Sequence, residues 1–221
     1  STFSVQAAIA IENARLFQMT DQQLAQRVQE LEILENIDTK LNRTLQLSEV
    51  AQITVEAAIA NTGAQAGALG IVVGNPPYLQ IVGIKGYEES DYPTGADGLQ
   101  WSLDRGVLSR VMRSRQADIV YDTNIDPDYE SGLHDSISQL TIPMMSADEI
   151  NAILILETNQ APPFNLGQWA FTQRLAEHAS IAIANAQLYA ELTRANESKS
   201  EFMGFAAHEL KTPLTSIKGF S

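Results

Sequence analysis

A helical repeat in the C-terminal part of the sequence limits the possible folds more than any other feature. Its positions recur in alternating steps of four and three residues: Ile181, Asn185, Leu188, Leu192, Ala195, Lys199, Phe202 and Ala206. This spacing places all of them on one narrow face of a single helix. A narrow apolar stripe on a polar helix is typical of helices that pair, so we expect a homodimer formed through parallel helices.

A second stripe follows the first and is displaced from it by one residue. Its members are again separated by steps of four and three, and they are Met203, Ala207, Leu210, Leu214 and Ile217. A displaced stripe allows a helix pair two packings of similar energy. We therefore hypothesise that a rotation or register change of the paired helices carries a signal along the chain.

A run of residues with side chains suited to catalysis lies within the second stripe. His208 is followed directly by Glu209, and then by Thr212 and Pro213. Residues four apart share a helix face, so Thr212 lies on the same face as His208. Unprotonated imidazole is a nucleophile near neutral pH, and an adjacent carboxylate can hold the proton on one ring nitrogen. A lone His-Glu pair is more often solvated surface, but the ordered run favours a functional site.

This run, residues 200–220, resembles the phosphoacceptor box of sensor histidine kinases. The resemblance implies that His208 accepts the γ-phosphoryl group of ATP, that Glu209 orients or deprotonates the histidine, and that Thr212 positions water for dephosphorylating a response regulator. It implies a parent protein-histidine kinase that uses ATP and Mg²⁺. Its partners would be the ATP-binding domain of the parent chain and a response regulator receiver domain. The sequence has no glycine-rich ATP lid, so we expect the fragment to hold no cofactor and to be inactive alone.

Charge and composition narrow the partners further. The chain has 27 acidic and 14 basic residues, a net charge of −13, and no cysteine. An acidic chain is repelled by nucleic acid and by anionic membranes, so neither is an expected partner. The lack of cysteine excludes disulfides, thiol catalysis and thioether-linked chromophores. No apolar run is long enough to span a membrane, and we expect a cytoplasmic location.

The middle of the sequence, residues 48–190, reads as one domain that contains both helices and strands. Ser48 is expected at the start of a helix that Gly63 ends. Residues 101–106 are expected to lead into a short helix over 107–112, and a long helix is expected from Leu166 onward. Apolar runs bounded by turn residues predict strands over 66–73, 78–84, 118–121, 140–145 and 149–156.

These elements, in this order, resemble a GAF domain, a small-molecule sensor module. The most specific similarities are Pro143 in the final strand pair, the segment 164–183 and the closing sequence at 182–186. The sequence departs from the family where Ala152 replaces a usual glycine. The resemblance implies an α+β fold: a GAF-like central antiparallel sheet flanked by helices, with long N- and C-terminal coiled-coil-type helices.

A ligand pocket between the sheet and the loops of residues 86–135 is expected from this family. The aromatic residues that could line it are Tyr87, Tyr92, Trp101, Tyr121 and Tyr129. Such aromatics more often close the core of a loop than contact a ligand. His134 lies among acidic residues and is expected to be solvated, and the aspartates of the loop match no calcium-binding spacing. We therefore predict no metal site, and the ligand itself stays unidentified.

The N-terminal part of the chain repeats a sequence from the end of the middle domain. Gln6–Phe17 aligns without gaps to His178–Tyr189, with Ala7, Ile9, Asn13 and others identical. We interpret residues 1–19 as the closing helix of a preceding GAF-like module. Residues 20–47 carry an irregular apolar stripe and are expected to form a signalling helix or coiled coil. An alternative is that Leu34 and Ile37 pack on the chain's own domain.

These observations lead to one functional interpretation and one alternative. The chain is expected to be the sensory and dimerisation segment of a two-component sensor histidine kinase. In it a GAF domain over residues 48–190 relays a signal to His208 through residues 191–221, which are expected to be a linker helix and the first part of the histidine phosphoacceptor helix. The alternative is a non-enzymatic dimeric regulatory module that binds a small molecule.

Overall fold

The structure is a computed structural model that describes the backbone of residues 2–92, 98–130 and 132–218. It describes side chains within residues 12–203 of these ranges, apart from residues 14 and 26. The chain divides into two units, residues 1–40 and 41–221. The first unit is helical: α1 runs from Thr2 to Leu41 without a break, so one helix continues from the first expected N-terminal segment into the second and ends before residue 47. The boundary between those segments stays a prediction.

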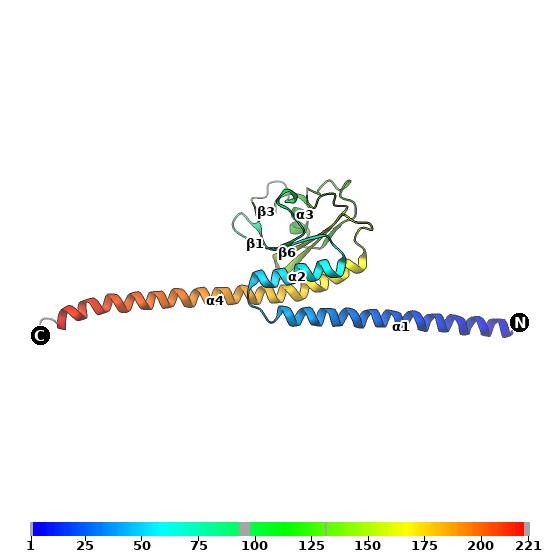
Figure 1. Ribbon diagram of the computed structural model, residues 1–221, viewed down its shortest axis with the longest axis horizontal. Helices are drawn as coiled ribbons and strands as arrows, with labels where there is room; N and C mark the ends of the chain where they lie inside the picture. The colour runs from blue at the N-terminus through cyan, green and yellow to red at the C-terminus, as the bar shows by residue number, and fades with distance from the viewer. Residues whose placement is uncertain (1, 93–97, 131, 219–221) are drawn as a thin grey trace. The chain divides into compact units, whose positions relative to one another are not determined.

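The second unit is built on one antiparallel sheet of six strands in the order β3-β2-β1-β6-β5-β4 (Figure 1). This confirms the α+β fold with a central antiparallel sheet. The strands are β1 (Ala66–Val73), β2 (Tyr78–Lys85), β3 (Gln100–Ser102), β4 (Asp118–Val120), β5 (Ser138–Ser146) and β6 (Glu149–Thr158). The other elements are α2 (Leu47–Thr62), the 3-10 turn η1 (Glu89–Asp91), α3 (Gly106–Ser114) and α4 (Leu166–Lys218).

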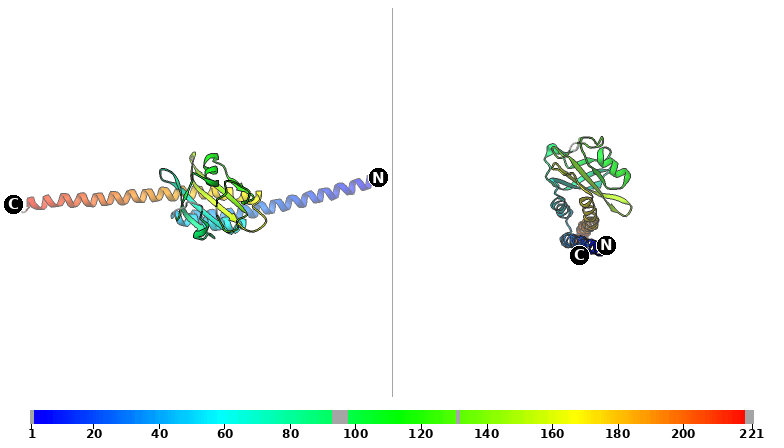
Figure 2. Two further views of the ribbon diagram at one scale, coloured as in Figure 1. Left: turned by 90° about the horizontal axis from the view of Figure 1, so that it is seen from above. Right: turned by 90° about the vertical axis from the view of Figure 1, so that its right-hand side faces the viewer.

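Helix α2 and the first part of α4 lie side by side on one face of the sheet, as Figures 1 and 2 both show. The buried residues of α4 include Leu175, Ala179 and Ile183, and those of α2 include Ala51 and Val55. Small residues let a helix approach a sheet closely. At Gly83 the approach leaves no room for a side chain, because a Cβ there would lie 2.8 Å from the carbonyl carbon of Ala51.

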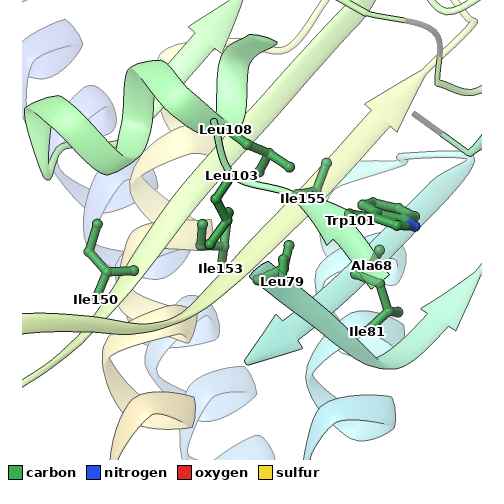
Figure 3. Packing of buried hydrophobic residues seen from close by; sticks show 9 residues of the cluster. All are labelled: Ala68, Leu79, Ile81, Trp101, Leu103, Leu108, Ile150, Ile153 and Ile155. Carbon is green, nitrogen blue, oxygen red and sulfur yellow. The ribbon is translucent and has the colours of Figure 1, made fainter. Parts of the chain in front are cut away.

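The opposite face of the sheet carries α3, the long loops and a second apolar core (Figure 3). Because strand side chains alternate between faces, Ile153 and Ile155 of β6 point into this core, whereas Leu154 and Leu156 point toward the helices. The buried members of this core are Ala68, Leu79, Ile81, Trp101, Leu103, Leu108, Ile150, Ile153 and Ile155. Strand β6 is therefore apolar on both faces, which explains its continuous hydrophobic run.

One strand was not predicted from the sequence, and one expected helix start is wrong. Residues 100–102 form the strand that was missed, β3, an edge strand paired with β2 that also leads toward α3. Three residues are too few to show alternation. Helix α2 begins at Leu47 after the N-cap residue Gln46, so Ser48 lies inside the helix. The expected end of this helix is confirmed, since Gly63 follows it in the left-handed conformation (φ 72°).

Within residues 2–92, 98–130 and 132–218, no helix combines enough length with enough apolar character to cross a bilayer.

The contact at Gly83 generates a stability prediction. Gly83→Ala should lower the free energy of unfolding by about 1–3 kcal/mol, because overpacking must push α2 away from the sheet. In the double variant Ala51→Gly/Gly83→Ala the clash is reduced, so its loss should be smaller than the sum of the two single losses. Urea unfolding measures all three. Ala60→Gly, at an exposed position of α2, gives the cost of the Ala-to-Gly change itself. Additive losses would contradict this account of the packing.

Candidate ligand-binding cavity

A buried carboxylate, Glu157, lies at the end of β6 on the face that carries α3. Its position follows from strand alternation, because Glu157 is two residues beyond the core residue Ile155. Its side chain accepts hydrogen bonds from several segments of the chain. The Tyr87 hydroxyl donates to Oε1 at 2.9 Å, and Oε2 receives the Tyr129 hydroxyl at 2.8 Å and the Leu133 N–H at 3.0 Å. Segments far apart in the sequence therefore meet at one carboxylate.

The two tyrosines act as donors because their hydroxyls stay protonated. Burial, followed by the negative charge of Glu157, raises the pKa of Tyr87 well above its ordinary value. The same two causes, in the same order, raise the pKa of Tyr129. Both hydroxyls are therefore neutral donors throughout the physiological range of pH.

Opposing effects set the pKa of Glu157. Burial disfavours the charged form and raises the pKa above 4.5, while hydrogen bonds from Tyr129, Ser136, Tyr87 and the Leu133 N–H lower it; burial prevails. The carboxylate has little freedom to move away, because a Cβ added at Gly132 would overlap both of its oxygens. Glu157 is thus held in place by its environment.

Glu157 lines a cavity between the sheet and the loops. The volume that the centre of a water molecule can reach inside it is about 30 Å³. A site for one water needs roughly 10–15 Å³ by this measure, so the cavity holds a group of only a few non-hydrogen atoms. Its other lining residues come from η1, β3, α3, β5, β6 and the loops between them, and include Tyr87, Asp91, Trp101, Arg105, Glu130 and Gln139.

Two polar atoms of the lining residues are buried without a partner. Trp101 Nε1 and Gln139 Oε1 each lack a hydrogen-bond partner among the described residues. Trp101 is 1% exposed, and its ring contacts the Tyr87 ring edge-on, with 6.0 Å between the ring centroids. The centroid of the Tyr92 ring lies 5.7 Å from that of Trp101. A buried polar group without a partner costs about 1–3 kcal/mol, so these atoms favour a polar occupant of the cavity.

An ion-pair network secures the loop that closes this region. Arg110 of α3 donates to both carboxylate oxygens of Asp118, at 2.7 and 3.0 Å, and to Asp126 and Asp128, each at 3.0 Å. The hydrogen bond from Arg110 is the main reason that the pKa of Asp126 is lowered. The network ties the loop of residues 121–137, which supplies Tyr129 and Leu133, to α3 and β4.

The aromatic residues singled out in the sequence occupy different places. Tyr87 and Trp101 line the cavity, Tyr92 packs on Trp101, and Tyr129 donates to Glu157. Tyr121 is 52% exposed and is not part of the lining. Their role in ligand binding stays a prediction. Sequence reasoning missed Glu157, although a charged residue that continues an apolar strand is a signal that could have found it.

The residues of the candidate phosphoacceptor box lie on α4, whose backbone is helical as far as Lys218. The side chains of His208, Glu209 and Thr212 lie outside the described residues, so their roles stay predictions. His134, which was expected to be solvated, has an exposed side chain whose Nδ1 lies 3.1 Å from Oδ2 of Asp135. Within the part of the chain that is described, no three His, Asp or Glu side chains gather as a metal site would require.

The six-stranded sheet, with helices on one face and a cavity on the other, defines a small α+β domain of the sensor type. A family model described as GAF domain matches residues 44–184, and the chain belongs to this family. The fold is shared with the GAF domain from the Acinetobacter phosphoenolpyruvate-protein phosphotransferase, at a TM-score of 0.63 and 17% identity over 72% of this chain and 95% of that one. It is also shared with the free methionine-R-sulfoxide reductase from Neisseria meningitidis in complex with its substrate. The TM-score is 0.62 and the identity 14%, over 72% of this chain and 91% of that one.

A curated relative shows a further similarity in sequence. The circadian input-output histidine kinase CikA of Thermosynechococcus vestitus is 32% identical over an alignment of 114 residues. This alignment covers 38% of the chain and 15% of CikA. The chain is thus weakly related to a histidine kinase, and it corresponds to a small part of that protein.

The buried carboxylate generates a prediction about pH. Because the pKa of Glu157 is higher in the folded protein than in the unfolded chain, the folded state binds more protons between the two values. The contribution of protonated Glu157 to the free energy of unfolding is fully present below about pH 4.5 and is lost as the pH rises through the pKa of the folded protein. The loss is about 1.4 kcal/mol for each pH unit between the two values.

Urea unfolding of the wild type and of Glu157→Gln over a pH series measures this effect. The stability of the wild type relative to the variant should fall as the pH rises from about 4.5. Glu149→Gln changes an exposed glutamate of the same strand and supplies the matched control. A difference that stays constant, or that grows in favour of the wild type, would contradict the raised pKa.

Proposed function

We propose that the chain is the sensory and dimerisation segment of a two-component sensor histidine kinase, in which the GAF domain controls phosphorylation of His208. The observation that carries the proposal is the continuity of α4 from Leu166 to Lys218. One end of this helix is part of the GAF domain, and its other end contains the sequence that resembles a phosphoacceptor box. A displacement of the first part of a rigid helix moves the last part as well.

The attachment of α4 to the sheet supports a mechanical connection. Leu175, Ala179 and Ile183 are buried. The Ser180 hydroxyl donates to the carbonyl oxygen of Met145 at 2.7 Å, close to the end of β5. A change in the sheet is therefore transmitted to α4 through packed side chains and at least one direct hydrogen bond.

The exposed stripe of the same helix supports dimerisation. Leu188, Leu192 and Phe202 are 58%, 67% and 69% exposed, and they belong to the stripe with steps of four and three. A helix that is polar elsewhere gains stability when such a stripe packs against its equivalent in a second chain. We therefore propose a parallel homodimer in which the two α4 helices pair beyond the GAF domain.

The reaction assigned to the parent protein is phosphoryl transfer. A ring nitrogen of His208 attacks the γ-phosphorus of ATP, a bond to nitrogen forms, and ADP leaves; Glu209 takes or holds the proton of the ring. The phosphoryl group then passes to an aspartate of a receiver domain, and Thr212 positions water for its hydrolysis. ATP and Mg²⁺ would be bound by the ATP-binding domain of the parent chain, where metal and positive charge stabilise the transition state.

The relationship to CikA supports this assignment, because that protein's name describes it as a histidine kinase. The alternative is a non-enzymatic dimeric regulatory module that binds a small molecule. The cavity at Glu157 favours the sensory part of either function, since it exists independently of His208. The two candidates differ in whether His208 accepts phosphate.

Labelled ATP distinguishes them. The full chain is incubated with a histidine kinase ATP-binding domain that complements it, and transfer of label to the chain is measured. The proposal predicts label on the wild type and none on His208→Gln. Glu209→Gln should slow labelling by about a hundredfold, the usual contribution of a general base. His134→Gln removes an exposed loop histidine and is the matched control that should keep full labelling. An unlabelled wild type, or equal labelling of His208→Gln, would support the non-enzymatic alternative.

A further inference from the structure

The cavity contains a negative charge that no cationic side chain of the described residues neutralises. Glu157 is 2% exposed, and its donors Tyr87, Tyr129 and the Leu133 N–H are all neutral. The salt bridges within the described part of the chain do not include this carboxylate. Neutral donors reduce the cost of burying a charge, but they do not supply the opposite charge that would offset it.

The other charged residues of the lining make the cavity more negative. Asp91 and Glu130 also line it, and Arg105 is the one cationic lining residue. Arg105 is already 3.7 Å from Glu130, and both side chains are partly exposed. The charges of Arg105 and Glu130 therefore offset each other on the side of the cavity that reaches solvent. The buried part keeps the negative charges of Glu157 and Asp91. Asp91 is 8% exposed.

A second observation points to an occupant. Trp101 Nε1 and Gln139 Oε1 belong to lining residues, are buried, and have no partner among the described residues. The free amide oxygen of Gln139 can accept a hydrogen bond from an N–H group, as the Glu157 carboxylate can. The volume of about 30 Å³ limits the occupant to a group of few atoms. The Trp101 Nε1–H is a donor that a cationic group cannot accept from, so the cationic head is indicated by the buried charge, the free Gln139 oxygen and the small volume.

We propose that the GAF cavity binds a small organic cation whose ammonium or amidinium group donates hydrogen bonds to the Glu157 carboxylate. This inference rests on the proposed sensory function and specifies the class of its ligand. The bound cation provides the missing opposite charge, and its N–H groups join the donors that Tyr87 and Tyr129 already supply. The selectivity comes from charge, because a neutral molecule of the same shape leaves the carboxylate uncompensated.

Fluorine NMR of the full chain labelled with 5-fluorotryptophan tests the proposal. The sequence has two tryptophans, so one signal reports on the cavity through Trp101 and the other, from Trp169 of α4, is an internal control. Trp169→Phe assigns the two signals. Acetamidinium, acetamide and acetate have the same size and differ in charge. Methylammonium and methanol are also nearly equal in size and differ in charge. These are the probes, each added at millimolar concentrations.

We expect acetamidinium or methylammonium to shift the Trp101 signal in a saturable way and to leave the Trp169 signal in place. Acetamide, methanol and acetate should not shift it at the same concentrations. Glu157→Gln should weaken cation binding by about tenfold or more, the effect of losing one charge-assisted hydrogen bond. Glu149→Gln, which changes an exposed residue of the same strand, should keep the affinity of the wild type. An unchanged Trp169 signal verifies that each variant is folded.

Several results would overturn the proposal even if Glu157→Gln failed to fold, because the comparison of probes uses the wild type alone. Equal binding of acetamide and acetamidinium would show selection by shape. Preference for acetate would show an anion site at Arg105. No shift with any probe would show that water alone fills the cavity. The labelling of His208 is measured without these probes, so failure of cation binding with normal labelling rejects only the ligand class. Cation binding without labelling rejects the kinase assignment and retains the cavity.

Discussion

The packing of α4 on the sheet is the interaction on which the rest of the structure depends. Leu175, Ala179 and Ile183 commit one face of the helix to the GAF core, while Leu188 and Leu192, one to three turns further on, are exposed. The same helix is thus an internal element of the domain over its first part and an unpaired amphipathic helix beyond it. Because a helix is stiff over such lengths, its orientation beyond the domain is fixed by how its first part packs.

Strand β6 connects the cavity on one face of the sheet to the helices on the other face. Glu157 and Ile155 point to the face with the loops, whereas Leu154 and Leu156 point to the face with the helices. A ligand that changes the position of Glu157 therefore acts on a strand that contacts α2 on its other face and that pairs with β5, against which α4 packs. The hydrogen bond between Ser180 and the Met145 carbonyl connects the neighbouring strand β5 to α4 as well. Close packing makes such a sheet responsive to small displacements.

The sequence was sufficient to predict the elements whose patterns are long or strongly punctuated. The hairpin of β1 and β2, the end of α2 at Gly63 and the start of α4 at Leu166 follow from apolar runs, glycine and helical spacing. The edge strand β3 is too short to have a pattern, and α2 begins at Leu47, after Gln46, without a capping hydrogen bond from a side chain. These details depend on tertiary contacts that no local signal contains.

The candidate site was only partly predictable for a related reason. Aromatic residues in a loop are visible in the sequence, and Tyr87 and Trp101 do line the cavity. The carboxylate that Tyr87 and Tyr129 share comes from a strand that is distant in sequence. Glu157 is 70 residues from Tyr87 and 28 residues from Tyr129. Only the folded register of β6 brings Glu157 to them. The unpartnered state of Trp101 Nε1 is likewise a property of the packed domain.

Disulfide cross-linking along α4 tests the central claim most directly, namely that two copies of this helix pair in parallel beyond the GAF domain. The sequence contains no cysteine, so single cysteines at successive positions from 188 to 203 can be compared without background. If the two helices pair in parallel, cross-linked dimer is most abundant at Leu188, Leu192, Ala195, Lys199 and Phe202 and falls between them, with alternating steps of four and three. Uniform cross-linking along the helix, or maxima on the opposite face at Arg194, Glu197 and Glu201, would contradict it.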